Sequence, residues 1–178
     1  YDFKHDQMEK DVFLAEEWRK CLNSVMTRYP HVLDQPSPLS GEPALKEEIA
    51  KYIYRTRNVA SDSSRMIIGA GIQPLLFILC ALLKRDGIDL CMFEEPGYNR
   101  AKAVFLQNGF RVKGYVPEQG DLSHEGERAA LYASPSRQFP TGSIMPIGQR
   151  IQLVDWLKQT DGYLIEDDFN GELHYQGN

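Results

Sequence analysis

The sequence lacks three features that would each indicate a particular class of protein. It has no excess of basic residues, since 20 Lys and Arg stand against 25 Asp and Glu and the net charge is −5. A free-standing nucleic-acid-binding protein is usually basic, so this chain is not expected to bind DNA itself. It has no long apolar run, because the longest, Leu75 to Leu83, is too short to span a bilayer. Its first residues also lack the charged and apolar blocks of a signal peptide.

Cysteine is scarce as well. The three cysteines, Cys21, Cys80 and Cys91, stand in apolar or mixed settings. A small odd number favours reduced thiols in a cytoplasmic protein over a disulfide framework. The 178 residues, 42% of them apolar and 25% charged, have the proportions of one globular domain or of a piece of a larger one. Because the first residue is Tyr rather than Met, we expect a piece of a longer chain.

Apolar residues recur with helical spacing in some stretches and form short runs in others. Helices are predicted at residues 11–26, from Pro43 onward, and at 74–84, 98–108 and 146–158. Strands are predicted at residues 66–68, 88–93, 111–116, 129–133 and 163–165. The side chains expected to be buried are Leu45, Ile49 and Ile53 in the second helix, and Ile147, Ile151, Val154 and Leu157 in the last.

Strands and helices alternate from residue 66 onward, and the strands are almost entirely apolar. This pattern predicts an α/β fold with a mainly parallel sheet flanked by helices on both faces. Residues 1–42 are interpreted as a helix and loop that precede a domain of residues 43–178. In sheets of this kind ligands bind at the carboxyl ends of the strands, so candidate site residues are sought there.

The first predicted strand ends in small residues. Gly69-Ala70-Gly71-Ile72-Gln73-Pro74 connects this strand directly to a helix. The free N–H groups of a helix's first turn favour an anion such as phosphate, which makes Gly71, Ile72 and Gln73 candidate binding residues. A tight turn without a ligand is the alternative. The segment also half-matches the dinucleotide fingerprint Gly-x-Gly-x-x-Gly, but Pro74 stands in place of the third glycine.

Two further strand ends carry candidate residues. Tyr98 follows Pro96-Gly97 and either stacks on a planar ligand or is an ordinary half-buried tyrosine. The last strand runs into Glu166-Asp167-Asp168, three carboxylates that need water or a nearby cation. A solvated strand end is the main interpretation. A metal site with His174 as a further ligand is the lesser alternative, and no metal is expected.

Taken in order, these loops resemble the pyridoxal-phosphate aminotransferases of fold type I, and more closely the aminotransferase-like domain of MocR/GabR-type regulators of the GntR family. The segments that carry the resemblance are Ser40-Gly41-Glu42-Pro43-Ala44-Leu45-Lys46-Glu47, Gly69-Ala70-Gly71-Ile72-Gln73, Glu95-Pro96-Gly97-Tyr98, Pro135-Ser136-Arg137-Gln138-Phe139-Pro140-Thr141-Gly142, Met145-Pro146 and Ile165-Glu166-Asp167-Asp168-Phe169. They cover almost the whole chain in the family's order. The paired Gln-Phe-Pro-Thr-Gly and Ile-Glu-Asp-Asp motifs are typical of the regulator branch.

The resemblance implies a partial large domain of a class I/II pyridoxal-phosphate-dependent transferase, and it assigns roles to residues of this chain. The backbone at Gly71, Ile72 and Gln73 is expected to hold the phosphate of pyridoxal phosphate. Tyr98 is expected to stack on the pyridine ring, and Asp167 to pair with the ring nitrogen. Phe169 is the last cofactor-binding candidate, at a position where family members usually have a tyrosine whose phenol reaches the cofactor.

Several positions depart from the family pattern and weaken the expected site. Ile72 offers no hydroxyl to the phosphate, Phe169 offers no phenol, and Arg137 stands where a histidine is common. The family's Schiff-base lysine lies downstream of the Asp-Asp motif, whereas the last lysine here is Lys158. We therefore expect no catalytic residue in this chain, no aminotransferase activity, and weak, non-covalent binding of pyridoxal phosphate.

The function implied by the resemblance is effector sensing and dimerisation in a transcription regulator whose DNA-reading domain lies outside this chain. The expected partners are further copies of the chain and a small amine or amino-acid effector, with no membrane. A piece of a true class I/II aminotransferase is the first alternative, and a dinucleotide-binding domain is the second. The resemblance also predicts self-association, because in the family a further strand would flank the last strand of this chain.

Overall fold

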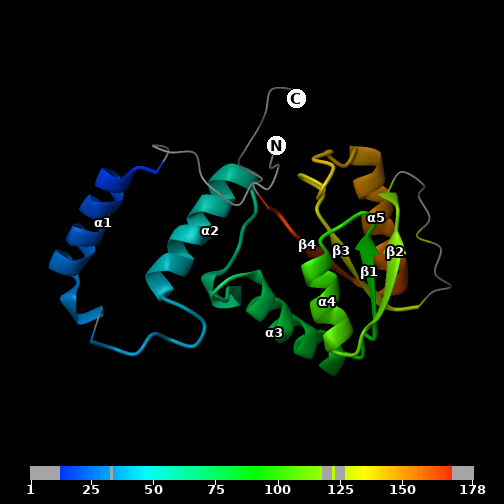
Figure 1. Cartoon of the computed structure of the whole chain (residues 1–178), viewed down its shortest axis with the longest axis horizontal. Helices are drawn as coiled ribbons and strands as arrows, with labels where there is room; N and C mark the ends of the chain where they lie inside the picture. Colours follow the sequence, from blue (N-terminus) through cyan, green and yellow to red (C-terminus); the bar gives the residue numbers. More distant parts are fainter. Residues whose placement is uncertain (1–12, 33, 118–121, 123–126, 170–178) are drawn as a thin grey trace, which may run out of the picture. The chain divides into compact units, whose positions relative to one another are not determined.

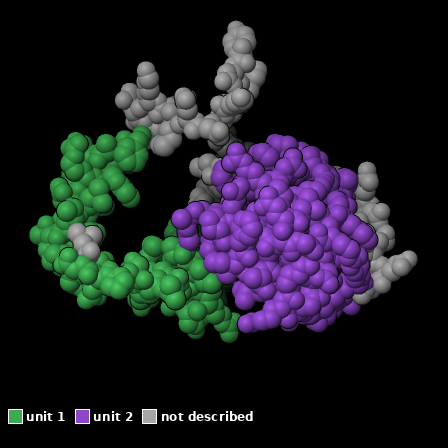
Figure 2. Space-filling view, turned by 60° about the horizontal axis from the view of Figure 1, so that its bottom comes forward, with its two compact units in different colours: residues 1–68 green, residues 69–178 purple. Residues whose placement is uncertain are grey.

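A computed structural model of the chain describes residues 13–32, 34–117, 122 and 127–169 (Figure 1). The chain divides into two compact units, residues 1–68 and residues 69–178, which Figure 2 shows in different colours. The sequence alone predicts one incomplete domain, residues 43–178, preceded by a helix and loop segment of residues 1–42. None of the described helices is long and apolar enough to cross a membrane.

The described part of the first unit is helical. α1 spans Ala15–Arg28, the short turn η1 Pro30–Val32, α2 Pro43–Arg57, and the short turn η2 Ser63–Arg65. Pro43 occupies the first turn of α2, where a missing N–H costs no hydrogen bond. Asn58 follows the last residue of α2 in the left-handed conformation, at φ 54°. Both predicted helices are present, and residues 11 and 12 of the first predicted range lie outside the described residues.

The strand predicted at residues 66–68 is wrong, because this segment has no regular secondary structure. Its apolar residues suit a strand, but a strand also needs a neighbour that accepts and donates a ladder of hydrogen bonds. The backbone N–H of Ile68 instead donates to the carbonyl oxygen of Ser40, at 3.0 Å. The segment therefore follows η2 as an irregular connection and ends the first unit at Ile68.

The prediction that Leu45, Ile49 and Ile53 form the buried stripe of α2 is also wrong. Leu45 is 47% exposed, and the two isoleucines are only half-buried. The buried residue of this helix is Lys46, whose Nζ donates to Oγ of Ser40 at 2.8 Å. Within its unit α2 packs mainly on η2, and this three-residue turn is too small to cover an apolar helix face.

The second unit is built on a four-stranded parallel sheet. Its strands are β1 (Leu90–Glu94), β2 (Arg111–Tyr115), β3 (Ala129–Ala133) and β4 (Tyr163–Glu166), and they lie side by side in the order β2-β1-β3-β4. Every neighbouring pair is parallel. β1 and β3 are buried along their whole length, which explains why their sequences are almost continuously apolar. The predicted α/β fold with a parallel sheet is confirmed.

Helices cover both faces of this sheet (Figure 1). They are α3 (Ile72–Arg85), α4 (Asn99–Gln107) and α5 (Ile147–Thr160). α3 and α4 share one buried cluster with Cys91 and Phe93 of β1, whereas α5 shares a second cluster with Leu90 and Met92. Since successive side chains of a strand point to opposite faces, the two clusters lie on opposite sides of the sheet.

The face of α5 that packs on the sheet is not the predicted one. Ile147, Ile151 and Val154 were expected to be buried, but they are 74%, 54% and 41% exposed. The buried residues are Leu153, Leu157 and Thr160, so only Leu157 was assigned correctly. Both triplets have the same i, i+4, i+7 spacing, and helical periodicity alone does not distinguish between them.

One arginine joins the segments that precede three of the strands. Arg128, just before β3, donates from Nε to the carbonyl oxygen of Asp161 at 2.8 Å and from Nη1 to that of Asp86 at 2.6 Å. Its Nη2 lies 2.8 Å from the Asp86 carboxylate, which also accepts a hydrogen bond from the Tyr163 hydroxyl at 2.8 Å. The amino ends of β1, β3 and β4 are thereby held together.

This cluster predicts a pH-dependent contribution to stability. The hydrogen bonds from Tyr163 and Arg128 lower the pKa of Asp86. A carboxyl group whose pKa is lower in the folded state stabilises that state above its unfolded pKa, about 4, and the contribution is lost as the pH falls through the folded pKa. We expect Asp86→Asn to lower the free energy of unfolding near neutral pH, and the difference from wild type to shrink in acid. Denaturant titrations across this range measure it, and Asp155→Asn is the control, with no such loss expected.

A second prediction concerns the close approach of the chain at Gly97. A Cβ at this position would overlap the carbonyl oxygen of Glu94, whereas at Gly148 in α5 a Cβ would meet no atom within 4 Å. Gly97→Ala is therefore expected to lower the free energy of unfolding by about 1–3 kcal/mol. Gly148→Ala is the matched control and should raise it by up to about 1 kcal/mol, because alanine favours helix. Equal effects of the two substitutions in denaturant unfolding would contradict the described turn.

Candidate functional site

The loops that carry most of the candidate residues leave the sheet at its carboxyl edge. β3 and β4 are in register, with Ala133 opposite Glu166, and Phe93 of β1 lies opposite Tyr132 of β3. The N–H of Asp167 continues this ladder by donating to the carbonyl oxygen of Ala133 at 2.8 Å. Because the three strands are parallel, the segments that follow them emerge together.

Asp167 is held in place by a buried tyrosine. The Tyr132 hydroxyl donates a hydrogen bond to Oδ2 of Asp167, and the Tyr132 ring stacks on that of Phe93, with centroids 5.0 Å apart and planes at 19°. Burial, followed by the hydrogen bond and the charge of Asp167, raises the pKa of Tyr132. The phenol therefore stays protonated and acts as a donor that fixes the orientation of the carboxylate.

Tyr98 lies on the same side of the sheet as Asp167. It immediately precedes α4 and packs against the cluster that contains Phe93 and Tyr132. Its ring meets that of Phe139 edge-on, with centroids 6.1 Å apart and planes at 86°. Tyr98 is also one of the groups whose charge would raise the pKa of Tyr132. The structure thus places Tyr98 and Asp167 on the same side of the sheet, beside the cluster that contains Tyr132.

Gly71 directly precedes α3 and Ile72 and Gln73 are its first residues, so the helix begins two residues before the predicted start at Pro74. Gly71 precedes the helix at φ 97°, a conformation that favours glycine, and a Cβ there would meet no atom within 4 Å. All three residues are exposed. The N–H of Gly71 donates to the carbonyl oxygen of Gly69 at 2.9 Å, so the N–H groups open to an anion are those of Ile72 and Gln73. No hydrogen bond between the described residues joins this turn to Tyr98, Asp167 or Phe169. Their grouping around one ligand stays a prediction.

Phe169 is less well placed for a specific contact. It lies in a turn three residues after the end of β4 and is 64% exposed. An exposed phenylalanine can pack on a ring but cannot donate a hydrogen bond. Its role as a binding residue stays a prediction.

If the candidate residues meet around one ligand, they suit a planar, cationic heteroaromatic ring that carries a phosphate. Asp167 supplies a fixed carboxylate for a ring N–H, Tyr98 supplies an aromatic ring, and the start of α3 supplies open N–H groups for the phosphate. Pyridoxal phosphate has this chemistry, so these residues could hold it. Among the described residues, no group of three or more His, Cys, Asp or Glu side chains could hold a metal ion.

Sequence reasoning missed a buried carboxylate on the opposite face of the sheet. Glu94, the last residue of β1, is 4% exposed. It accepts a hydrogen bond from the backbone N–H of Ser134 at 3.0 Å and one from the Tyr115 hydroxyl at 3.3 Å. Burial, with the charge of Glu94, raises the pKa of Tyr115. The available signal was a carboxylate that ends the otherwise apolar strand Leu90–Glu94.

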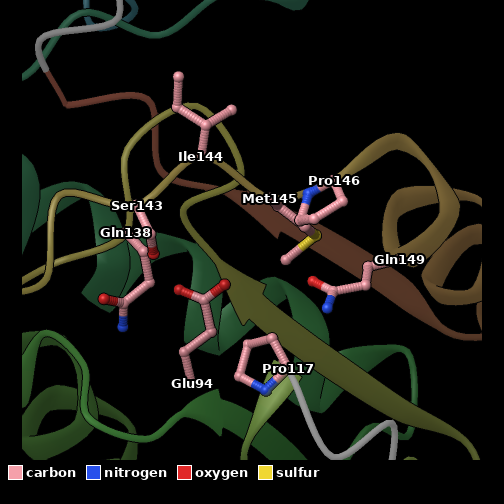
Figure 3. A pocket seen from close by; sticks show the side chains of 8 residues that line it. All are labelled: Glu94, Pro117, Gln138, Ser143, Ile144, Met145, Pro146 and Gln149. Atoms are coloured by element: carbon pink, nitrogen blue, oxygen red, sulfur yellow. The ribbon is translucent and has the colours of Figure 1, made fainter.

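Glu94 also borders a cavity of about 220 Å³ (Figure 3). The other lining residues come from the loop after β3, the start of α5 and the end of β2, and they are Pro117, Gln138, Ser143, Ile144, Met145, Pro146 and Gln149. None of the predicted cofactor-binding residues lines this cavity.

Gln138 belongs to the Gln-Phe-Pro-Thr-Gly motif, but the motif alone does not predict its structural role. Its side-chain amide donates to the carbonyl oxygen of Pro96 and accepts hydrogen bonds from the N–H and Oγ1 of Thr141, at 3.2 and 2.6 Å. This buried side chain therefore ties the loop after β3 to the turn before Tyr98. The Gln-Phe-Pro-Thr-Gly segment closes on itself as well, because the N–H of Gly142 donates to the carbonyl oxygen of Gln138 at 2.7 Å.

Comparison with known proteins shows which families the chain resembles. The helix-turn-helix-type transcriptional regulator YdeL of Bacillus subtilis (strain 168) has 35% sequence identity to this chain. The aligned region covers 99% of the chain and 38% of the regulator. The probable rhizopine catabolism regulatory protein MocR of Rhizobium meliloti is 32% identical over 78% of the chain and 29% of its own length. The chain thus spans less than half of the regulators that it resembles. The resemblance predicted from the motifs is confirmed.

Solved structures show the same fold. The kynurenine aminotransferase of Pyrococcus horikoshii, crystallised with PMP, superposes on this chain with a TM-score of 0.80. The superposition covers 93% of this chain and 44% of the aminotransferase chain, and the sequence identity is 23%. The family model for aminotransferase class I and II matches residues 16–176. The chain belongs to the aminotransferase class I and II family.

Proposed function

We propose that this chain is the aminotransferase-like, effector-sensing part of a transcription regulator. The observation that carries the proposal is the similarity to regulators such as YdeL, which extends over 99% of the chain at 35% identity. The acidic balance of the chain, with a net charge of −5, supports DNA contact through a part outside this sequence. The sensing site would be the carboxyl edge around Tyr98 and Asp167.

Pyridoxal phosphate is the proposed cofactor of this site. When bound, it supplies an electron-withdrawing ring and an aldehyde that recognises amines. Asp167, oriented by Tyr132, would hold the ring N–H. The turn at Gly71, Ile72 and Gln73 would hold the phosphate through the N–H groups of Ile72 and Gln73, since that of Gly71 donates to Gly69. The ring of Tyr98 would stack on the pyridine ring of the cofactor and fix the plane in which it lies. The ligand sensed through the cofactor would then be a small amine or an amino acid.

We further propose that this chain does not catalyse transamination. Enzymes of the family use a lysine to bind the cofactor covalently and to move a proton, and the last lysine of this sequence, Lys158, precedes the Asp167 strand end. Lys158 lies on α5, on the opposite face of the sheet from Tyr132, and its side chain is 73% exposed. It is therefore poorly placed to serve the site.

Cofactor binding tests the proposed site. A useful probe is 4-deoxypyridoxine 5′-phosphate, which keeps the ring and the phosphate but has no aldehyde to react with surface lysines. Asp167→Asn removes the charge that pairs with the ring N–H, and we expect it to weaken binding about tenfold or more, since charge-assisted hydrogen bonds contribute about 1.5–3 kcal/mol. Fluorescence titration measures the affinity.

The adjacent exposed carboxylate offers a matched control. Glu166→Gln makes the same chemical change one residue earlier, where the side chain points to the other face of the strand. It should leave the affinity unchanged. An equal loss of affinity in both variants would contradict the assigned role of Asp167. Tight binding that is unchanged in Asp167→Asn would contradict it as well.

A second experiment tests the absence of catalysis. The 178-residue chain is incubated with pyridoxal phosphate, an amino acid and a 2-oxo acid, beside a class I/II aminotransferase as positive control. We expect amino acids to change the absorbance of the bound cofactor, without release of a new 2-oxo acid. Turnover with any amino acid would overturn the non-catalytic proposal and favour a piece of a true aminotransferase.

A further inference from the structure

The cavity beside Glu94 has no part in the proposed cofactor site. Its volume is about 220 Å³, and it lies on the face of the sheet that α5 covers (Figure 3). A water molecule in the liquid occupies about 30 Å³, so the cavity is larger than one or two structural waters require. At the packing density of protein interiors, about 0.74, it holds a molecule of roughly eight to ten non-hydrogen atoms.

The side of the cavity formed by the loop after β3 is fixed by hydrogen bonds. The N–H of Met145 donates to the carbonyl oxygen of Pro135 at 3.0 Å. The Arg150 guanidinium donates from Nε to the carbonyl oxygen of Met145 at 2.9 Å and from Nη2 to that of Pro135 at 2.8 Å. The Met145 side chain is buried in the same cluster as Tyr115. A ligand therefore meets a surface that is already in place, which lowers the cost of ordering on binding.

Two polar side chains that line the cavity indicate which ligand it suits. The Glu94 carboxylate accepts hydrogen bonds from the N–H of Ser134 at 3.0 Å and from the Tyr115 hydroxyl at 3.3 Å. A carboxylate can accept about four hydrogen bonds, so these two donors do not exhaust it. The half-buried side-chain amide of Gln149 makes no hydrogen bond to another described residue. Figure 3 shows the carboxylate and this amide turned toward the space between them.

The charge of the lining favours a cation over an anion. Glu94 is 4% exposed, and the described residues that line the cavity include no lysine or arginine. A buried carboxylate is stabilised by a cation that donates hydrogen bonds to it, whereas an anion beside it is repelled where water screens little. The apolar part of the lining suits a short carbon chain, and it consists of Pro117, Ile144, Met145 and Pro146.

We propose that this cavity binds a free small organic cation, with a guanidinium or ammonium group on a short apolar chain. The N–H groups of the cation donate to the Glu94 carboxylate and to Oε1 of Gln149, and the chain lies against Met145. Ser143 and Pro146 are exposed, so the ligand enters beside them. The site lies on the opposite face of the sheet from Tyr132, and the proposal is independent of the proposed cofactor and regulatory role.

Butylguanidinium and butylurea are a matched pair of probes. They have the same number of non-hydrogen atoms and nearly the same shape, but only the first is charged. An NMR titration of the isotope-labelled 178-residue chain, without pyridoxal phosphate, measures both affinities and shows which backbone amides respond. We expect butylguanidinium to bind about tenfold more tightly or better, because its hydrogen bonds to the carboxylate are charge-assisted. The largest shifts are expected between Ser143 and Gln149.

Two identical substitutions separate Glu94 from the overall charge of the chain. Glu94→Gln removes the carboxylate from the cavity and should weaken the binding of butylguanidinium about tenfold or more. Glu166→Gln makes the same change at the end of β4, where the side chain is exposed and does not line the cavity. It should leave the affinity unchanged. Since both variants lose one negative charge, a difference between them does not come from net charge.

A second pair of variants decides the question if Glu94→Gln fails to fold, which circular dichroism reveals. Gln149→Leu removes the half-buried amide and should weaken the binding of butylguanidinium about threefold or more. Gln152→Leu makes the same change at an exposed position of α5 that does not line the cavity, and should have no effect.

The proposal is wrong if butylguanidinium does not bind, or binds no more tightly than butylurea. It is also wrong if Glu94→Gln and Glu166→Gln have the same effect, because the cation is then attracted only by an acidic chain. If Glu94→Gln does not fold, equal affinities of Gln149→Leu and Gln152→Leu overturn it instead. Shifts centred on Tyr98 and Asp167 would place the cation at the candidate cofactor site and would equally contradict the proposal.

Discussion

The parallel pairing of β3 with β1 on one side and with β4 on the other is the constraint on which the carboxyl edge depends. It sets Phe93 opposite Tyr132 and Ala133 opposite Glu166, so that residues far apart in the sequence become neighbours. Tyr132 can reach Asp167 only because these registers hold. A shift by one residue would turn Tyr132 to the other face of the sheet and remove the donor that orients the carboxylate.

The alternation of side chains along β1 separates two environments at the same edge. Phe93 supports Tyr132 on the face covered by α3 and α4, while Glu94 points to the face covered by α5 and borders the 220 Å³ cavity. The turn at Gly97 and the amide of Gln138 connect the loops that leave this edge. The position of Tyr98 therefore depends on both faces, although only one of them carries the candidate cofactor residues.

Local patterns in the sequence predicted the strands and helices of the second unit. They could not predict which segments pair with one another or which helix face packs on the sheet. The apolar runs at 88–93 and 129–133 identified two buried strands, because a strand that is covered on both faces is almost continuously apolar. The equally apolar run at 66–68 is not a strand, since pairing is a property of two segments and periodicity describes one. The same limit explains why the buried face of α5 was assigned incorrectly, because this helix has two sets of residues with the same spacing and only one of them packs on the sheet. The Tyr132–Asp167 bond and the buried Glu94 follow from strand register, which the sequence pattern does not determine.

The two buried thiols have a practical consequence for the measurement of local opening. Cys80 lies on α3 and Cys91 on β1, within the same fully packed cluster. A reagent can reach them only when the helix separates from the sheet, so their alkylation rate under native conditions reports the free energy of that opening. If both thiols react at one rate, α3 and the sheet open as a single cooperative unit. If Cys80 reacts first, the helix detaches while the strands remain paired.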